Sequence, residues 1–342
     1  MFKSATVRSG DVAATQTNFP SYVDLDRLGI TTLAEAESVR VYADSGKTTE
    51  WAREIVSVTE MHVKVPSLTS TVEIFVDWDG VRADYAVTDT FGRNAVWSDY
   101  RLVHHLDDTT NATGNTSFNL TNVNSVTFTS GKLGNAAAFG ASNSNKHLHT
   151  GTNEPLDKTE VQQNWTISTW VKLTTLSTVT IIRQFGIDGS SKKSCQMAFD
   201  TSAGIRYQWT GSAVNQYSSG DNLTGNQWGK VDFVLGTSGA LNLYLDGVNI
   251  LTTTVTNFNS RGDTSGSDKR WMYGGDFAIG TLFNPLRGFM DESRLVLSPL
   301  TANWITTEYN NQNDEATFWG TWTDAGGAPA AQTARRGVVM MM

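Results

Sequence analysis

Cysteine, proline and charged residues are scarce in this sequence, and each scarcity excludes a class of protein. The single cysteine, Cys195, cannot form an intrachain disulfide, so the fold must depend on its hydrophobic core. Six prolines and thirty glycines are too few for a proline-rich or collagen-like chain. No run of about 18 apolar residues occurs, so we expect no membrane insertion.

Positive charge is also in short supply. Lysine and arginine number 26 against 34 aspartates and glutamates, which gives a net charge of -8. Because nucleic acids and anionic membranes are bound by clustered basic residues, we expect no nucleic-acid partner. The N-terminus lacks the apolar stretch and the small-residue cleavage site of a secretory signal peptide, which predicts a protein that is not exported by that route.

The sequence is instead rich in patterns typical of β-strands. Residues 39–42 and 61–65 alternate between apolar and polar side chains, as half-buried strands do, and residues 72–76 form a more apolar run typical of a core strand. Turn residues separate these segments. Residues 1–92 are therefore predicted to form a small N-terminal β-sandwich.

A second strand-rich region follows a connector and is predicted to form a larger domain over residues 93–318. Its strongest strands are 165–171, 231–235 and 241–245, and the last of these ends at Asp246-Gly247, a dipeptide typical of tight hairpins. One short helix is expected over residues 302–309. Small residues dominate the end of the chain, so residues 319–342 are predicted to be a flexible tail, or alternatively a peptide that docks on a neighbouring subunit.

Four motifs in the larger region resemble those of the concanavalin A-like, laminin-G-like jelly rolls found in phage virion and bacterial surface proteins. They are YRLVHHLDD at 100–108, GKLGNAAAF at 131–139, NWTISTWVK at 164–172, and GFMDESRL at 288–295 followed by LSPLT. Residues 19–25, 37–42 and 97–100 resemble a short β domain of unassigned function that often precedes such a jelly roll. The resemblance implies an all-β protein of two β-sandwich domains with a recognition role at a surface.

An enzymatic role is tested by searching for paired acids. Glucanases of this sandwich class place two carboxylates on one strand face as Glu-x-Asp-x-x-x-Glu or a form one residue shorter, and residues 95–318 contain no such pattern. Asp291 and Glu292 are adjacent, so on a regular strand they are expected to point to opposite faces. We therefore predict that the protein is not an enzyme.

Calcium is the metal ion that the resemblance implies. In the family, an aspartate of the closing strand often binds a structural Ca²⁺ together with backbone carbonyls, and the matching residue is Asp291. Asp107 and Asp108 form a second oxygen-rich candidate site; hydrogen bonding to loop amides is the alternative for all three. His147 and His149 share a strand face, but no third ligand lies near them in the sequence, and His104 and His105 belong to another strand.

Exposed aromatic rings are the usual platforms for sugars, and two pairs alternate along predicted strands. The candidate carbohydrate-binding residues are Tyr207, Trp209, Trp271 and Tyr273. Arg206 and Gln208 point to the other face of the first of these strands. If the aromatic pairs point between the sheets, they are core residues instead.

These observations favour a phage virion surface protein: a fibre, spike or capsid decoration. Its lectin-like domain would contact host surface polysaccharide or other virion subunits, most simply as a homo-oligomer. The alternative is a carbohydrate-binding adhesin module at the bacterial cell surface or in the extracellular medium. A polysaccharide-acting enzyme is a third possibility with less support.

Overall fold

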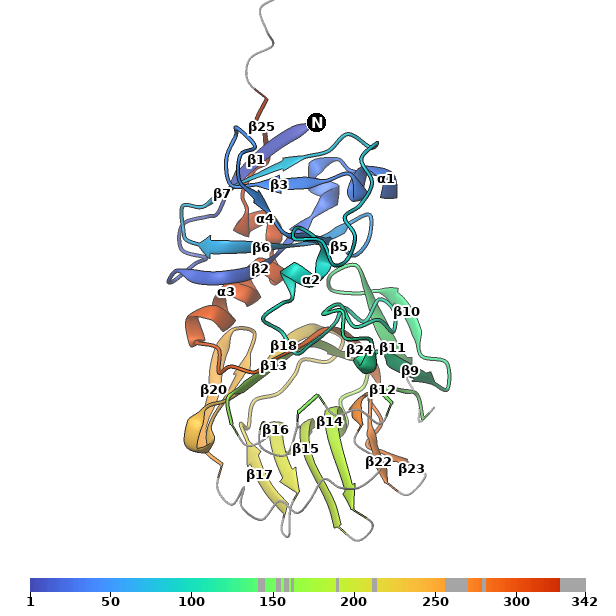
Figure 1. Ribbon diagram of the computed structural model, residues 1–342. Coiled ribbons are helices and arrows are strands. Elements are labelled where there is room, and N and C mark those ends of the chain that lie inside the picture. Colours follow the sequence, from blue (N-terminus) through green and yellow to red (C-terminus); the bar gives the residue numbers. More distant parts are fainter. Residues whose placement is uncertain are drawn as a thin grey trace, which may run out of the picture.

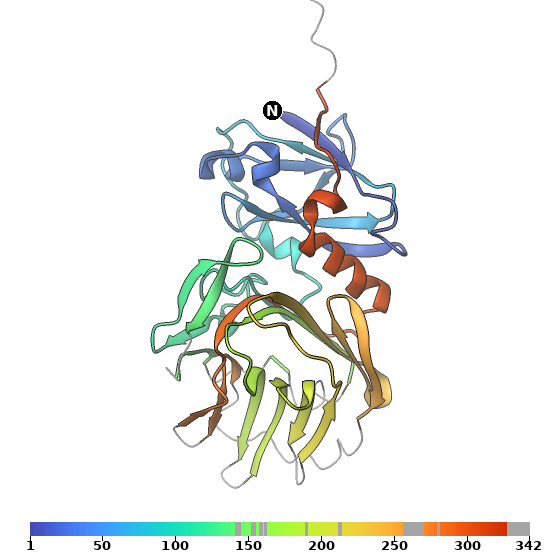
Figure 2. The ribbon, with the colours of Figure 1, turned by 180° about the vertical axis from the view of Figure 1, so that it is seen from behind.

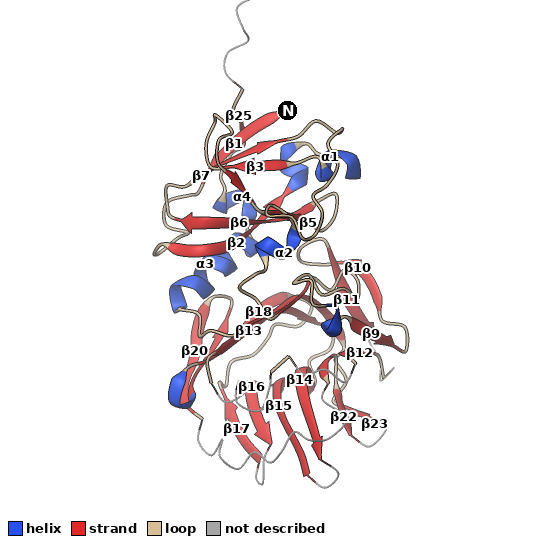
Figure 3. Ribbon diagram, viewed as in Figure 1, coloured by secondary structure: helices blue, strands red, loops and turns tan. Residues whose placement is uncertain are grey.

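The computed structural model describes residues 1–140, 145–151, 155–156, 160, 163–188, 191–210, 214–255, 270–278 and 281–326. Side chains are not described at 183–188, 191–194, 209–210, 214–215, 276–278 and 281–283. Two β-sandwiches are stacked end to end, with a few short helices between and around them (Figures 1 and 3). This confirms the predicted all-β class with two sandwich domains.

The N-terminal sandwich consists of a five-stranded and a three-stranded antiparallel sheet. The larger sheet has the order β25 (Thr323–Asp324), β1 (Phe2–Thr6), β7 (Glu73–Asp77), β3 (Arg40–Tyr42) and β4 (Glu50–Trp51). The smaller sheet has the order β2 (Gln16–Asp24), β6 (Glu60–Leu68) and β5 (Arg53–Ile55). Met61, Val63 and Val65 of β6 point into the core between these sheets. The other face of β6, which carries Glu60 and His62, is turned toward the larger sandwich.

The larger sandwich places two antiparallel sheets around one extended hydrophobic core. We call the sheet that faces the N-terminal sandwich the proximal sheet. Its order is β10 (Thr127–Ser130), β11 (Asn135–Gly140), β24 (Gly288–Val296), β13 (Trp165–Leu173), β18 (Trp228–Leu235), β19 (Ala240–Leu245) and β20 (Val248–Thr254), with β8 (Leu102–His104) also paired to β24.

The distal sheet forms the opposite layer of the larger sandwich. Its order is β17 (Val214–Ser218), β16 (Gly204–Thr210), β15 (Ser191–Asp200), β14 (Val179–Asp188), β21 (Trp271–Tyr273), β12 (His147–Thr150) and β9 (Leu120–Val123). A separate hairpin joins β22 (Asp276–Ala278) to β23 (Thr281–Phe283). Cys195 of β15 is buried in the core, where a small thiol packs as an apolar group.

The predicted hairpin and helix are both present. Asp246 and Gly247 take φ angles of 51° and 77° between β19 and β20, the positive values that a tight two-residue hairpin turn requires. The helix α3 (Ala302–Asn313) covers the predicted span and continues four residues further, and the side chain of Thr301 accepts the amide hydrogen of Trp304 at its N-terminus. The remaining helices are short: α1 (Leu33–Glu37), α2 (Arg93–Val96), α4 (Glu315–Phe318), and single 3-10 turns at Leu25–Leu28, Thr116–Phe118 and Thr237–Gly239.

After the larger sandwich, the chain returns to the N-terminal one (Figure 2). Phe318 and Trp319 are buried in the N-terminal core, and Trp322 packs against it. Strand β25 then pairs with β1 through Lys3 and Ser4. The prediction that a free tail begins at residue 319 is therefore wrong for residues 319–324, because two tryptophans and a strand attach this segment to the first domain.

Helix α3 lies between the two sandwiches and contacts both. Its Gln312 accepts a hydrogen bond from the Trp170 indole of the proximal sheet at 2.6 Å. Its Asn311 exchanges two hydrogen bonds with the backbone of Tyr22 in the N-terminal sandwich, at 2.7 and 3.0 Å. The two domains thus share a helix as well as an interface. Among the described residues, no helix is both long and apolar enough to cross a bilayer.

Candidate functional site

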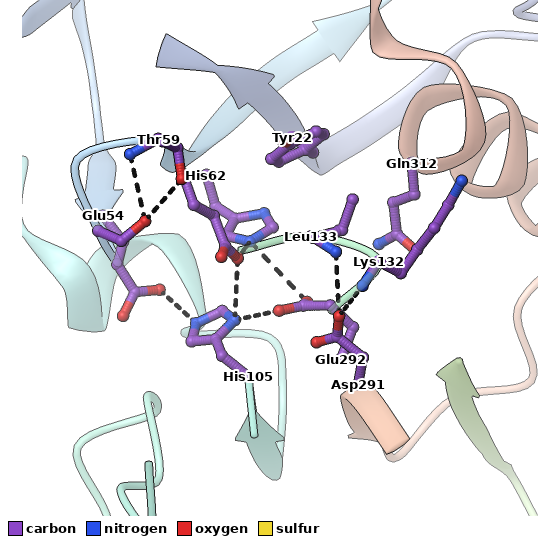
Figure 4. A network of polar contacts seen from close by, with 12 residues as sticks. Tyr22, Glu54, Thr59, His62, His105, Lys132, Leu133, Asp291, Glu292 and Gln312 are labelled. Carbon is purple, nitrogen blue, oxygen red and sulfur yellow. Dashed lines mark hydrogen bonds and ion pairs between the residues drawn. The ribbon is translucent and has the colours of Figure 1, made fainter. Parts of the chain in front are cut away.

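A group of buried histidine and acidic side chains lies where β24 faces the N-terminal sandwich. A β-bulge in β24 turns two of the acidic side chains toward this interface. Ser168 pairs with Arg294 and Trp170 with Asp291, so two residues of β24 stand opposite one residue of β13. The extra residue is Glu292, with a φ of 50°. Because of this bulge, Asp291 and Glu292 both face the first domain (Figure 4). The expectation that they point to opposite faces is therefore wrong.

His105 is held between carboxylates of both domains. Its Nε2 lies 2.9 Å from Oε2 of Glu54 on β5, and its Nδ1 lies 2.5 Å from Oε1 of Glu292. Burial alone would lower the pKa of His105, but the carboxylates of Glu292 and Glu54 outweigh it and raise that pKa well above 6.5. In the opposite direction, His105 and Arg294 overcome the effect of burial and lower the pKa of Glu292.

His62 and Glu60 of β6 complete a compact group with His105 and Glu292. The Nε2 atom of His62 lies 3.0 Å from Oε1 of Glu60 and 3.8 Å from Oε2 of Glu292. The rings of His62 and His105 stack with their centroids 5.0 Å apart. Burial lowers the pKa of His62, whereas burial and the nearby charge of Glu292 raise the pKa of Glu60. The surroundings therefore favour the protonated form of His105 and the neutral form of His62.

The loop between β10 and β11, residues 131–134, closes over this group. The backbone amides of Lys132 and Leu133 donate to Oδ2 of Asp291 at 2.7 and 3.0 Å. A Cβ atom at Gly134, where φ is +62°, would lie 2.2 Å from Oε2 of Glu60. The glycine allows the loop backbone to approach the buried carboxylate, which explains the glycine-rich motif seen in the sequence.

A second set of ion pairs continues from this group toward α3. Arg294 donates to Glu292 at 2.5 Å and to Glu308 of α3 at 2.8 Å. Lys230 contacts the other oxygen of Glu308 at 2.8 Å and also pairs with Asp232. All five side chains are buried. Strand β24, strand β18, helix α3 and the N-terminal sandwich are thereby joined by one charged network.

The three aspartates predicted to bind metal are not brought together. Asp291 is buried and uses one carboxylate oxygen to accept two amide hydrogens, as described above, and burial raises its pKa. Asp108 is exposed and accepts hydrogen bonds from the backbone and hydroxyl of Thr110. Burial raises the pKa of Asp107 to about 6. In the described part of the chain, the one convergent group of histidine and acidic donors is Glu60, His62, His105 and Glu292. Calcium at Asp291, Asp107 and Asp108 stays a prediction.

The predicted aromatic platforms for sugar are core residues. Tyr207, Trp271 and Tyr273 are fully buried between the two sheets. Trp209 lies on β16, but its side chain is outside the described part of the structure. The prediction of a carbohydrate site on these three rings is therefore wrong, and the core alternative holds because the large apolar rings gain more by burial.

The outer face of the distal sheet presents polar side chains instead. Gln196, Gln208 and Gln216 stand directly opposite one another across β15, β16 and β17. Beside them, Nη1 of Arg206 lies 3.0 Å from Oδ2 of Asp200. Gln196 is buried, Gln208 is half-buried and Gln216 is exposed, so this row leads from the sheet to solvent. It faces away from the N-terminal sandwich.

The sequence did not indicate that Glu54, Glu60 and His62 belong to this site, because these residues lie in the N-terminal sandwich whereas His105 lies in the larger one. Glu60 and His62 are two residues apart on a strand and therefore share a face. That spacing was the available signal, but nothing in the linear sequence indicates that the face is covered by a second domain.

Comparison with known proteins addresses the larger sandwich. Residues 142–306 match the model of the concanavalin A-like lectin/glucanases superfamily, which confirms the resemblance for this domain. The match does not reach the N-terminal sandwich, so the identity of that domain stays a prediction. No curated protein matches the sequence.

Several solved structures are similar to part of the chain. Domain 4 of AbnA, an extracellular GH43 arabinanase from Geobacillus stearothermophilus solved with arabinotriose, is 19% identical, with 62% of this chain and 98% of that chain covered and a TM-score of 0.48. The binding domain of botulinum neurotoxin serotype D is 14% identical, with coverages of 63% and 52% and a TM-score of 0.47. The sialidase CBM40 of Ruminococcus gnavus, bound to α2,3 sialyllactose, is 15% identical, with coverages of 43% and 83% and a TM-score of 0.37.

Proposed function

We propose that the protein is a surface-exposed binding protein of a phage virion, in which the distal face of the lectin-like sandwich recognises host surface polysaccharide. Gln208 and Gln216, which form the solvent-accessible end of the glutamine row, carry this proposal. Each glutamine amide both donates and accepts hydrogen bonds, which matches the mixed donor and acceptor character of sugar hydroxyls. The lectin family match of residues 142–306 supports the same role.

The arrangement of the domains suits a protein that is attached at one end and binds at the other. Strands β1 and β25 lie side by side in the N-terminal sandwich, while the distal sheet lies at the far end of the molecule (Figure 1). The shared helix α3 and the buried charged network oppose hinge motion between the domains. We therefore assign attachment to the N-terminal sandwich, either to other virion subunits or to a second copy of the chain.

The acidic residues of the domain interface favour binding over hydrolysis. Glycoside hydrolysis needs two carboxyl groups that reach a sugar from opposite sides. Glu60, Asp291 and Glu292 do converge, but each is at most 2% exposed in the interface between the two sandwiches. A polysaccharide chain cannot reach them without separation of the domains.

A glycan array and a panel of purified bacterial surface polysaccharides test the proposed binding face. The double variant Gln208→Ala/Gln216→Ala should weaken binding on the order of tenfold, because each lost hydrogen bond contributes about 0.5–1.5 kcal/mol. Gln227→Ala, an exposed glutamine in a loop of the same domain, is the matched control and should bind like the parent protein. Equal binding by the double variant would remove this face from the proposal.

The location requires a separate experiment. Gold-labelled antibodies against the chain should decorate phage particles and not uninfected bacteria. Labelling of uninfected cells would instead support the alternative, an adhesin module of the bacterial surface or the extracellular medium.

A further inference from the structure

We propose that Glu60, His62, His105 and Glu292 form a binding site for one transition-metal ion of the Zn²⁺ class, which joins the two sandwiches. This site is separate from the distal face and does not depend on glycan binding. Two ligands come from β6 of the N-terminal sandwich and two from the larger sandwich. Figure 4 shows His62, His105 and Glu292 pointing toward one another, and the donor atoms of these three residues and Glu60 all lie within 4.8 Å of one another.

The spacing of the donor atoms fits a tetrahedral ion. Zn²⁺ binds histidine nitrogen and carboxylate oxygen at about 2.0–2.2 Å, which places tetrahedral donors about 3.3–3.6 Å apart. In the structure, the His62–Glu60 and His62–Glu292 distances are 3.0 and 3.8 Å. The His105 Nδ1 atom lies 3.8 Å from Oε1 of Glu60 and 2.5 Å from Oε1 of Glu292. The His62–Glu292 contact is made by the other oxygen, Oε2, so Glu292 offers the ion one of these two oxygens. These values lie on both sides of the tetrahedral edge, and every pair of donors lies within 4.8 Å. Small side-chain rotations are therefore sufficient to seat the ion.

The surroundings of His105 are those of a metal ligand. Its Nδ1 points into the group, while Nε2 lies 2.9 Å from a carboxylate oxygen of Glu54. A carboxylate that accepts the remaining N–H fixes the orientation of a ligating histidine and increases its basicity. The Trp97 indole also donates to the same oxygen of Glu54 and holds it in place.

His62 also makes a contact outside the group of four that metal binding must rearrange. Its Nδ1 lies 3.5 Å from Nη2 of Arg294. Binding of the ion at Nε2 leaves the ring proton on Nδ1, facing the guanidinium. Arg294 is also held by Glu292 and Glu308, so a small rotation of the His62 ring relieves this approach without loss of either ion pair.

The charge balance of the interface also favours a cation. The buried acidic groups of the network outnumber the basic groups that face them. The acidic side chains are Glu54, Glu60, Asp232, Asp291, Glu292 and Glu308, and the basic ones are His105, Lys230 and Arg294. Burying carboxylates away from water is costly, and a divalent ion held between Glu60 and Glu292 reduces this cost.

The donor set indicates the kind of ion. Imidazole nitrogens suit Zn²⁺, Co²⁺, Ni²⁺ and Cu²⁺, whereas Ca²⁺ and Mg²⁺ prefer oxygen ligands throughout. Glu54, which contacts His105, also lines a surface pocket of about 120 Å³ together with Arg53, Asp84 and Arg93. The pocket ends at Glu54, whose carboxylate contacts the Nε2 side of His105.

Metal binding to the full chain tests the proposal directly. After removal of metals with a chelator, titration with Zn²⁺ should give one bound equivalent, measured by elemental analysis after dialysis, and should raise the melting temperature. Co²⁺ used in place of Zn²⁺ should give the intense visible absorption of tetrahedral cobalt. Absence of both a bound equivalent and this absorption would overturn the proposal.

Substitutions locate the site. Glu60→Gln and His62→Gln should abolish binding of the equivalent, and Glu54→Gln should weaken it about 10–100-fold, as expected for a supporting carboxylate. His149→Gln, which alters a histidine pair of the distal sheet, is the matched control and should bind normally. Binding that persists in Glu60→Gln and His62→Gln but is lost in His149→Gln would assign the ion elsewhere. If the first two variants do not fold, Glu54→Gln and the cobalt spectrum still decide the question.

Discussion

The two outer faces of the larger sandwich are built by the same strand alternation but are put to different uses. On the proximal sheet, the outward residues include Lys230, Asp232 and Arg294, and all are buried beneath the N-terminal sandwich and α3. On the distal sheet, the outward residues include Gln208 and Gln216, which reach solvent. The charged outer face of the proximal sheet packs against the other domain, whereas the outer face of the distal sheet is accessible to solvent at Gln208 and Gln216.

This difference shows that charge in a sequence does not identify the exposed face of a strand. A buried ion pair is tolerated where each member finds several partners, and Arg294 has Glu292 and Glu308. Uncharged amides cost less to desolvate than charged groups when a partner covers them, and each can both donate and accept hydrogen bonds. We therefore infer that the free face of this sandwich is the one on which the described outward side chains include a row of amides.

Removing a charge from the network should have the largest effect. Arg294→Met leaves Glu292 and Glu308 buried without their shared cation, so we expect a loss of about 3–5 kcal/mol in the free energy of unfolding. Arg206→Met on the distal face breaks a pair with Asp200 that retains contact with solvent and should cost less than about 1 kcal/mol. Urea unfolding followed by tryptophan fluorescence measures both. Equal losses would break the comparison between the faces.

Two adjacent histidines show how strongly the domain interface differs from the core in its effect on a side-chain pKa. His104 points into the core, where its ring contacts the Tyr273 hydroxyl at 2.8 Å and the Phe118 carbonyl at 2.9 Å. Burial lowers the pKa of His104 to about 3. His105 points to the interface, where Glu292 and Glu54 overcome burial and raise its pKa well above 6.5. Two neighbouring histidines are thus expected to differ in charge near neutral pH, with His104 neutral and His105 protonated.

The metal-free protein should show this difference in its pH dependence. Because the pKa of His104 is lowered on folding, its contribution to stability is lost as the pH falls from 6.5 toward 3, with a slope of up to about 1.4 kcal/mol per pH unit. Because the pKa of His105 is raised, its contribution is complete below pH 6.5 and is lost as the pH rises through the raised value.

Ring chemical shifts from NMR, assigned by single substitutions, measure the two sites separately. His104 should be neutral at about pH 5 and His105 protonated at about pH 7.5, on opposite sides of the ordinary histidine value. Titration of both rings near pH 6.5 would show that the core and the domain interface do not differ in their effect on the histidine pKa.

The fold could be predicted from the sequence because local pattern and global structure agree. Residues 61–65 alternate as a strand, Asp246-Gly247 forms the expected tight turn, and α3 begins where Thr301 can cap it. Alternation also separated Tyr207 correctly from Arg206 and Gln208. It could not identify which of these faces points to the core, because that depends on the second sheet.

The polar site could not be predicted for two physical reasons. The bulge at Glu292 changes which face the acidic residues occupy, and one inserted residue leaves no mark on the composition of the strand. The partners Glu54 and His62 come from a domain whose own strands appear, from sequence alone, to have a solvent-exposed polar face. Interfaces between domains are formed by such faces, and only the tertiary structure shows which ones meet.

The smallest expected effects lie within the glutamine row, where they sharpen the account of the free face. Gln208→Ala and Gln216→Ala should each change the free energy of unfolding by less than about 0.5 kcal/mol, since these side chains reach solvent. Gln196→Ala should cost about 1 kcal/mol, because this buried amide donates to the Thr180 hydroxyl and its removal leaves that group with one partner fewer. Thermal unfolding of the three variants measures the gradient. Equal and large losses at all three positions would mean that the row belongs to a packed surface, whereas a graded series would leave Gln208 and Gln216 available to a ligand.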